Sequence, residues 1–288
     1  MKFGIVFANS GPSAEPDHAT GLAQLAEEAG FDSLWTVEHV VVPSGYESPY
    51  PYAKSGRMPG GEDIPVPDPL IWLSYVAAVT TRIKLATGIL ILPQRNPAVV
   101  AKEAATLDVL SKGRLILGVG VGWLKEEFDV LRVPFEERAA RTDEYIEALR
   151  VFWTQPEPTY AGQFTSFERA KSYPKPVQAG GVPIVIGGHT PAAARRAGRL
   201  GDGFFPARGG LDELPGLLDV MRAAASDAGR DADAIEVTTG GAMDIETAKK
   251  YTDLGVSRLV IPPLGFDLET LKRQLGDFGE NVIAPLSS

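Results

Sequence analysis

Residues 84–123 constrain the fold more than any other part of this chain. They read KLATGILILPQRNPAVVAKEAATLDVLSKGRLILGVGVGW, with apolar, β-rich runs at Leu85–Leu92 and Leu115–Val121 on either side of an amphipathic segment at Ala98–Leu110. Two parallel strands need a long crossover connection, which is usually a helix. The segment therefore predicts a strand–helix–strand unit within a parallel sheet.

The same alternation of apolar runs and amphipathic segments extends along the whole chain. We predict strands at 2–8, 33–37, 85–92, 115–121, 183–186, 203–206, 235–239 and 258–261, and helices at 18–29, 69–79, 98–110, 136–153, 191–200, 212–228, 245–254 and 268–278. Eight such units in 288 residues favour one (β/α)8 TIM barrel, formed by residues 1–288, over an open doubly wound sheet. No Gly/Ser-rich linker divides the chain into two domains.

Two long polar segments interrupt this alternation, at 38–66 after the second strand and at 154–182 before the fifth. We expect both to be irregular, and loops of such length are commonly functional. The first must lie at the C-terminal end of the barrel, where active sites of this fold are found. Its residues Tyr46, Tyr50 and Tyr52 either line a pocket or pack the insertion against the barrel.

The composition excludes several classes of function. A net charge of −9 disfavours binding to nucleic acid or to anionic membranes, both of which need a basic surface. The absence of cysteine excludes disulfides, thiolate nucleophiles and thiolate-bound metals, and no metal-ligand spacing occurs. No segment resembles a membrane span or a signal peptide. We therefore expect a cytoplasmic protein that acts on a small molecule, without a bound metal.

The chain has only three histidines, and two of them directly follow predicted strands. His39 comes after the second strand and His189 after the fifth, where the catalytic groups of a barrel gather. Histidine can transfer a proton near neutral pH, and the neighbouring Glu38 can orient or charge the imidazole of His39. Adjacent residues at a strand end usually point in opposite directions, however. We predict His39 and Glu38 as catalytic candidates; the alternative is a loop histidine bonded to the backbone.

Two glycine-containing turns are candidates for ligand binding. The turn after the fifth strand offers backbone N–H groups and a helix N-terminus to an anion such as a phosphate, through Gly187, Gly188, His189, Thr190 and Pro191. The spacing of Gly118, Gly120 and Gly122 matches half of a dinucleotide-binding fingerprint. The rest of that fingerprint is missing, so we discount a Rossmann site.

Four segments together resemble the luciferase-like monooxygenase (bacterial luciferase) superfamily. They are LAEEAGFDSLWTVEHV at 25–40, the segment at 85–123, ERAARTDEYIEALR at 137–150 and VPIVIGGHTPAAARRAGRLGDGFFP at 182–206. Within the superfamily, the chain is most similar to the oxidoreductases of actinobacteria that use the deazaflavin coenzyme F-420. The resemblance covers nearly the whole chain and implies a TIM barrel, usually dimeric, with the cofactor at the C-terminal ends of the strands.

The resemblance also implies roles for individual residues. His39 lies where the deazaflavin enzymes carry a histidine near the ring, and Gly88–Ile89 lies where they have a bulge behind the ring, often with a non-proline cis peptide. Gly187 and Gly188 match the turn that binds the cofactor phosphate, together with His189 and Thr190. The glycine-spaced loop, through Gly120 and Gly122, would also border the cofactor.

One departure from the family pattern leaves the reaction open. A relative that oxidises a sugar phosphate has a proton-donating glutamate where this chain has Trp123, and Glu126 and Glu127 follow only on the next helical turn. Sugar-phosphate oxidation is therefore not supported. Three functions remain: an F-420-dependent hydride-transfer oxidoreductase, an FMN-dependent monooxygenase supplied by a flavin reductase, and a cofactor-binding protein without turnover. We favour the first, in a homodimer.

Overall fold

The structure, a computed structural model, describes residues 1–206 and 210–287. Its strands are β1 (Lys2–Val6), β2 (Ser33–Thr36), β3 (Lys84–Thr87), β4 (Leu90–Ile91), β5 (Leu115–Gly120), β6 (Tyr160–Ala161), β7 (Ser166–Phe167), β8 (Ile184–Gly187), β9 (Gly203–Phe205), β10 (Glu236–Gly240) and β11 (Arg258–Ile261). Its α-helices are α1 (Pro16–Glu28), α2 (Pro69–Ala77), α3 (Pro97–Leu110), α4 (Lys125–Leu131), α5 (Arg138–Thr154), α6 (Pro191–Leu200), α7 (Leu214–Asp227), α8 (Ile245–Asp253), α9 (Leu268–Phe278) and α10 (Ala284–Ser287).

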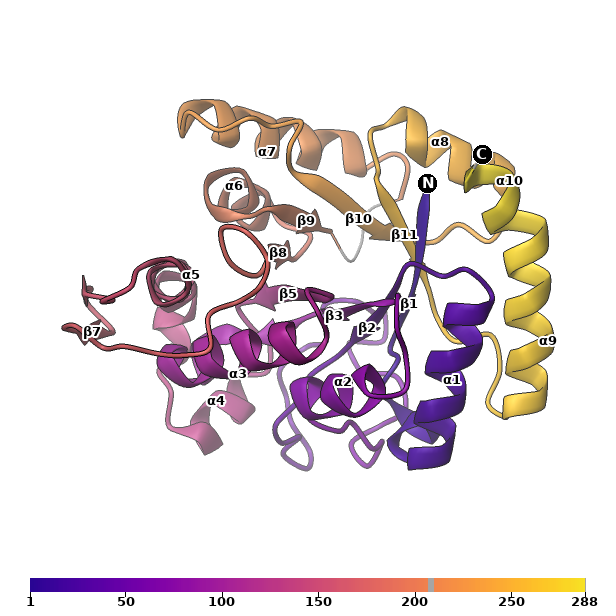
Figure 1. Cartoon of the computed structure of the whole chain (residues 1–288), viewed down its shortest axis with the longest axis horizontal. Coiled ribbons are helices and arrows are strands. Elements are labelled where there is room, and N and C mark those ends of the chain that lie inside the picture. Colours follow the sequence, from indigo (N-terminus) through magenta and orange to yellow (C-terminus); the bar gives the residue numbers. More distant parts are fainter. Residues whose placement is uncertain (207–209, 288) are drawn as a thin grey trace.

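The main sheet closes into a barrel with helices around it (Figure 1). Within the described residues its strand order is β3–β2–β1–β11–β10–β9–β8–β5–β4, and a pairing of β3 with β5 closes the ring. Its strand pairs are all parallel, and β4 continues the path of β3 after a short break. The predicted (β/α)8 TIM barrel is therefore confirmed.

The apolar core has two layers. The larger layer lies between the strands and the surrounding helices, and a smaller cluster fills the barrel with Trp35, Ala86, Ile116, Val185, Phe205 and Val260. Inside the barrel the rings of Trp35 and Phe205 meet edge to face, with their centroids 5.3 Å apart. No helix in residues 1–206 and 210–287 is long and apolar enough to cross a membrane.

The predicted strand at 85–92 is broken in the middle. The peptide bond between Gly88 and Ile89 is cis, and it separates β3 from β4. Leu85 pairs with Leu115, and Leu90 pairs with Val119. Five residue steps along β3 and β4 therefore match four steps along β5. One extra residue in a strand is a bulge. The bulge and the cis bond that the family resemblance implies at Gly88–Ile89 are thus both present.

Some elements differ from the sequence-based predictions. The helix α4 was not predicted, because its seven residues are too few to show a helical period. The segment 154–182 is not wholly irregular, because β6 and β7 form an antiparallel hairpin within it. Phe167 of this hairpin stacks on Phe152 of α5, with ring centroids 4.1 Å apart. Figure 1 shows the hairpin at the outer edge of the molecule, beside α5 and away from the barrel axis.

Candidate functional site

The break between β3 and β4 creates an apolar surface at the C-terminal mouth of the barrel. Gly88 lies directly against the barrel interior: a Cβ atom on it would be 3.1 Å from Cε3 of Trp35 and 3.2 Å from Cε1 of Phe205. The amide of Gly88 donates a hydrogen bond to the carbonyl of Thr36, at 2.6 Å. The bulge is therefore fixed beside the end of β2, which leads into His39.

The side chain of Ile89 explains two of the glycines. A Cβ atom on Gly120 would lie 2.7 Å from Cδ1 of Ile89, and a Cβ atom on Gly187 would collide with Cγ2 of the same side chain. Both glycines therefore leave room for Ile89 between the ends of β5 and β8. Gly122 has a similar packing role, since a Cβ atom there would lie 2.7 Å from Cε2 of Phe128 in α4. The structure thus places these glycines under or beside the apolar surface.

The turn after β8 is ordered by its own hydrogen bonds. Gly188 has a φ of +125°, a value that favours glycine, and its amide donates to the carbonyl of Phe205 at 3.1 Å. Thr190 is the N-cap of α6, and its hydroxyl oxygen accepts a hydrogen bond from the amide of Ala193 at 3.2 Å. The helix N-terminus therefore faces the same end of the barrel as the Ile89 surface, as an anion site would need.

His39 is held by a partner far away in the sequence. Its Nδ1 atom lies 3.1 Å from Oε2 of Glu127 in α4, and the His39 side chain is 10% exposed while that of Glu127 is fully buried. The imidazole also meets the ring of Trp123 edge to face, at 5.6 Å between centroids. Residue His39 is among those that line a cavity of about 380 Å³, together with Glu38, Val40, Val66, Asp68, Pro69, Gln94, Arg95 and Leu131. Glu127 was noted in the sequence but not linked to His39, because 88 residues separate them.

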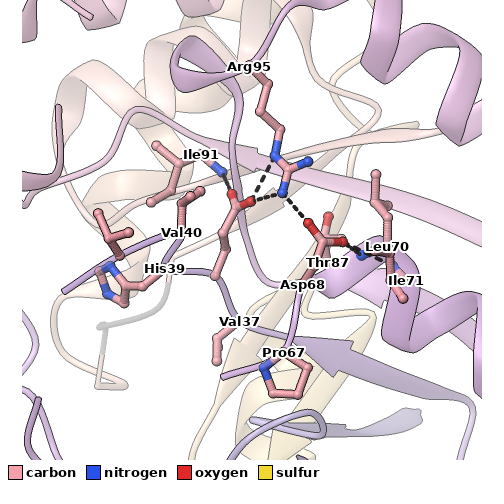
Figure 2. A network of polar contacts seen from close by, with 12 residues as sticks. Val37, His39, Val40, Pro67, Asp68, Leu70, Ile71, Thr87, Ile91 and Arg95 are labelled. Atoms are coloured by element: carbon pink, nitrogen blue, oxygen red, sulfur yellow. Dashed lines mark hydrogen bonds and ion pairs between the residues drawn. The ribbon is translucent and has the colours of Figure 1, made fainter. Parts of the chain in front are cut away.

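Glu38 belongs to a different network, shown in Figure 2. Its carboxylate, 1% exposed, accepts hydrogen bonds from the amide of Ile91 and from the guanidinium of Arg95, with Nε at 2.8 Å. Arg95 also reaches Oδ2 of Asp68 at 2.6 Å. Figure 2 shows the His39 ring lying away from Arg95, so the two neighbouring side chains point in different directions. The predicted catalytic role of Glu38 stays a prediction, and its contacts here join β2 to the segment after β4.

The ionisation of this network follows from burial and from the shared guanidinium. Burial raises the pKa of the Glu38 carboxyl, and the charge of Arg95 opposes that shift. Burial also tends to raise the pKa of Asp68, but hydrogen bonds from Arg95, the Ile71 amide and the Leu70 amide lower it overall. Burial lowers the pKa of Arg95, and its two carboxylate partners more than reverse this effect. Arg95 is thus a permanent cation between two acids.

Aromatic rings connect the two candidate histidines across the mouth of the barrel. The ring of Trp123 contacts that of Tyr50, at 5.2 Å between centroids. Tyr50 in turn contacts Tyr52 at 5.3 Å, and Tyr52 contacts the imidazole of His189 at 5.1 Å. The tyrosines of the first insertion therefore pack on Trp123 and on each other. Burial, followed by the neighbouring tyrosines, raises the pKa of Tyr50 to about 12, so this phenol stays neutral at physiological pH.

The first turn of α4 fastens the loop at 38–66 over this end of the barrel. Oε1 of Glu127 accepts hydrogen bonds from the amide of Val40 at 2.6 Å and from that of Val41 at 3.2 Å. Oε1 of Glu126 accepts from the amides of Glu47 at 2.8 Å and Ser48 at 3.0 Å. Two consecutive carboxylates thus hold two different parts of the same loop.

Relatives of known sequence match most of the chain. Residues 1–245 match the luciferase-like monooxygenase family. An uncharacterized protein of Mycobacterium tuberculosis (strain ATCC 25618 / H37Rv) is 34% identical over 272 residues, which cover 91% of this chain and 93% of that protein. The F420-dependent glucose-6-phosphate dehydrogenase of Nocardia farcinica (strain IFM 10152) is 36% identical over 237 residues, which cover 80% of this chain and 65% of that enzyme.

Solved structures share the whole fold. Monooxygenase RslO1 from Streptomyces bottropensis is 25% identical with a TM-score of 0.77, and the match covers 100% of both chains. An F420-dependent secondary alcohol dehydrogenase, solved with an F420–acetone adduct, is 19% identical with a TM-score of 0.78 over 98% of each chain, a likeness in fold alone. By its sequence and its barrel, the chain belongs to the luciferase-like monooxygenase family.

Proposed function

We propose that this protein is an oxidoreductase that transfers a hydride between the deazaflavin coenzyme F-420 and a small organic substrate. The observation that carries the proposal is the placement of His39 beside the Gly88–Ile89 bulge. The amide of Gly88 bonds to Thr36, three residues before His39, and Glu127 fixes the imidazole on its Nδ1 side. His39 thus follows the strand end to which the bulge is bonded, at the same end of the barrel as the apolar side chain of Ile89.

The residues present fit such a cofactor. Ile89 lies over Gly120 and Gly187 and offers an apolar surface to a ring system. The turn at Gly188, His189 and Thr190 offers a helix N-terminus to a phosphate-bearing tail. When bound, the deazaflavin supplies the carbon that accepts or donates the hydride. The protein has to orient the two reactants and move one proton.

His39 is the group we assign to that proton. Oxidation of an alcohol would release the proton of its O–H group as the bound cofactor took up the hydride of its C–H bond, and Nε2 of His39 would accept that proton. In the reverse direction the imidazolium returns the proton to the carbonyl oxygen. Histidine suits this exchange because it is both acid and base near neutral pH. Trp123 stands where sugar-phosphate-oxidising relatives carry an acid, so we do not extend the proposal to sugar phosphates.

Relatives support F-420 as the cofactor, and one structure supports an alternative. The enzyme from Nocardia farcinica, 36% identical, is named as F420-dependent. Monooxygenase RslO1, 25% identical over the whole chain, supports a monooxygenase as the alternative. In that alternative we propose FMN as the cofactor, received in reduced form from a partner reductase. A protein that binds the cofactor without turnover is the third reading. We place all three in the cytoplasm.

A binding titration separates these functions. We expect F-420 to bind with a Kd at least tenfold below that of FMN, measured by quenching of cofactor or tryptophan fluorescence. Turnover is then followed as loss of F-420 absorbance with a panel of alcohols, and in the reverse direction with carbonyl compounds. Tight FMN binding without F-420 binding, together with substrate-dependent oxygen uptake, would support the monooxygenase instead. Binding of F-420 without turnover on any substrate would support the third reading.

We also propose a homodimer formed through α2 and α3. These helices expose large apolar side chains on neighbouring surfaces: Ile71 is 73%, Tyr75 46% and Val99 52% exposed. Burying an apolar patch of this kind is a common basis of association. We expect the chain to sediment as a dimer at micromolar concentration and the Ile71→Glu variant to sediment as a monomer with unchanged far-UV circular dichroism. A monomeric wild-type protein would contradict this.

A further inference from the structure

We infer that Glu127 is the positioning residue of His39: it fixes the proton on Nδ1, so that Nε2 is the only ring nitrogen that exchanges a proton. The consequence for turnover rests on the proposed function. The fixed tautomer does not, because it follows from the hydrogen bonds alone.

Hydrogen bonds fix the position of the Glu127 carboxylate. Its side chain is fully buried in the first turn of α4, and both carboxylate oxygens are occupied. Oε2 faces Nδ1 of His39 at 3.1 Å, while Oε1 accepts from the amides of Val40 and Val41, at 2.6 and 3.2 Å. The two amides donate to Oε1, and a carboxylate accepts hydrogen bonds and donates none.

An acceptor-only partner decides which nitrogen carries the proton. A neutral imidazole has one N–H group, and the carboxylate of Glu127 places it on Nδ1. The imidazolium has two N–H groups, and the one on Nδ1 keeps the same partner. Loss or gain of a proton therefore takes place at Nε2. Among the described residues, no hydrogen bond engages Nε2, and His39 is one of the residues that line the cavity of about 380 Å³.

Trp123 fixes the plane of the same ring. Its indole is at 87° to the imidazole, and it is held in turn by the rings of Tyr46 and Tyr50, at 5.5 and 5.2 Å. Where some relatives carry an acid, this chain thus carries a side chain that orients the histidine. Glu127 sets the protonated edge of His39, and Trp123 sets its tilt. Precise placement of this kind is what a supporting residue contributes to a catalytic group.

The neighbouring Glu126 provides a matched control. It lies in the same helical turn and also binds two loop amides, those of Glu47 and Ser48, but it makes no contact with His39. The Glu126→Gln variant therefore changes the same type of charge on the same helix and loosens the same loop. An effect that Glu127→Gln shows and Glu126→Gln does not comes from the contact with His39 or from the adjoining amides of Val40 and Val41, and the tautomer of His39 separates the two.

The tautomer can be read directly from the nitrogen chemical shifts of the imidazole. With ¹⁵N-labelled histidine, the three histidines give three sets of signals, and the set missing from His39→Ala identifies His39. We expect wild type and Glu126→Gln to show a protonated Nδ1 and an unprotonated Nε2 when the ring is neutral. In Glu127→Gln the carboxamide can accept or donate, so we expect the other tautomer to appear as well.

Kinetics then test the consequence for turnover. We expect Glu127→Gln to lower kcat about 10- to 100-fold with the Kd for F-420 changed less than twofold. A neutral wild-type ring protonated on Nε2, or identical tautomers in wild type and Glu127→Gln, would overturn the inference even if the variant were unstable. A changed tautomer with unchanged kcat would leave the positioning role intact and would instead contradict the proton transfer by His39.

Discussion

Replacement of His39 by alanine should lower kcat for hydride transfer by about 100- to 10,000-fold, the usual contribution of a general acid–base group. The variant loses the imidazole that accepts the substrate proton, and its neighbour Glu127 does not replace it, because that carboxylate is fully buried and bound to the loop amides. The loss should fall on kcat, while the Kd for F-420 changes little, because Ile89 and the turn at Gly188 are untouched. Steady-state assays and a cofactor titration measure the two effects separately.

Folding of this variant is a separate question with its own control. His39→Ala leaves Oε2 of Glu127 without its partner, and such a loss destabilises a protein by about 1–3 kcal/mol. His18→Ala is the matched change, because His18 also makes two ring contacts, to Ser13 and to the carbonyl of Phe266, in another part of the molecule. We expect His18→Ala to keep wild-type kcat and exogenous imidazole to restore part of the activity of His39→Ala. Full activity in folded His39→Ala would rule out its role.

The barrel could be predicted from the sequence because each strand and helix of a parallel sheet shows a pattern among neighbouring residues. Apolar runs such as Leu115–Val121 and the helices between them carry the pattern in a few neighbouring residues, and Asp68–Pro69 marks the start of α2, as the structure confirms. The bulge at Gly88–Ile89 was expected from the resemblance to the family, and it gives the glycine inside this apolar strand a physical reason.

The partners within the site were not predictable, because they are contacts between distant segments. Nothing near His39 in the sequence indicates Glu127, and nothing near Glu38 indicates Arg95, 57 residues further on. The glycines show the same limit. Gly120 and Gly187 attracted attention as ligand-binding residues, whereas the structure shows a packing reason for each, since the side chain of Ile89 fills the space where a Cβ atom would be.

Removal of Arg95 should be the most destabilising single change at this end of the barrel. Arg95→Met leaves the carboxylate of Glu38, 1% exposed, with only the amide of Ile91, and it removes the partner of Oδ2 of Asp68. Removing one partner of a buried ion pair typically costs about 3–5 kcal/mol. Urea unfolding at pH 7.5 measures this cost. Arg150→Met is the matched control, since Arg150 pairs with Asp202 at a site where both side chains are 35% exposed and a loss below about 1 kcal/mol is expected.

The pH dependence of the stability lost in Arg95→Met tests whether the buried charge of Glu38 causes that loss. Burial already raises the pKa of Glu38 in the folded protein, and loss of the Arg95 charge raises it further. The folded variant then binds a proton that the unfolded chain releases, so its stability increases as the pH falls toward the ordinary glutamate range. We expect the free energy of unfolding of Arg95→Met to differ less from that of wild type at pH 5 than at pH 7.5.

The double variant Glu38→Gln/Arg95→Met should be more stable than Arg95→Met at pH 7.5, because a neutral carboxamide has no charge to desolvate. Equal losses at both pH values, with no gain in the double variant, would show that packing of the Arg95 side chain, rather than the buried charge of Glu38, accounts for the effect.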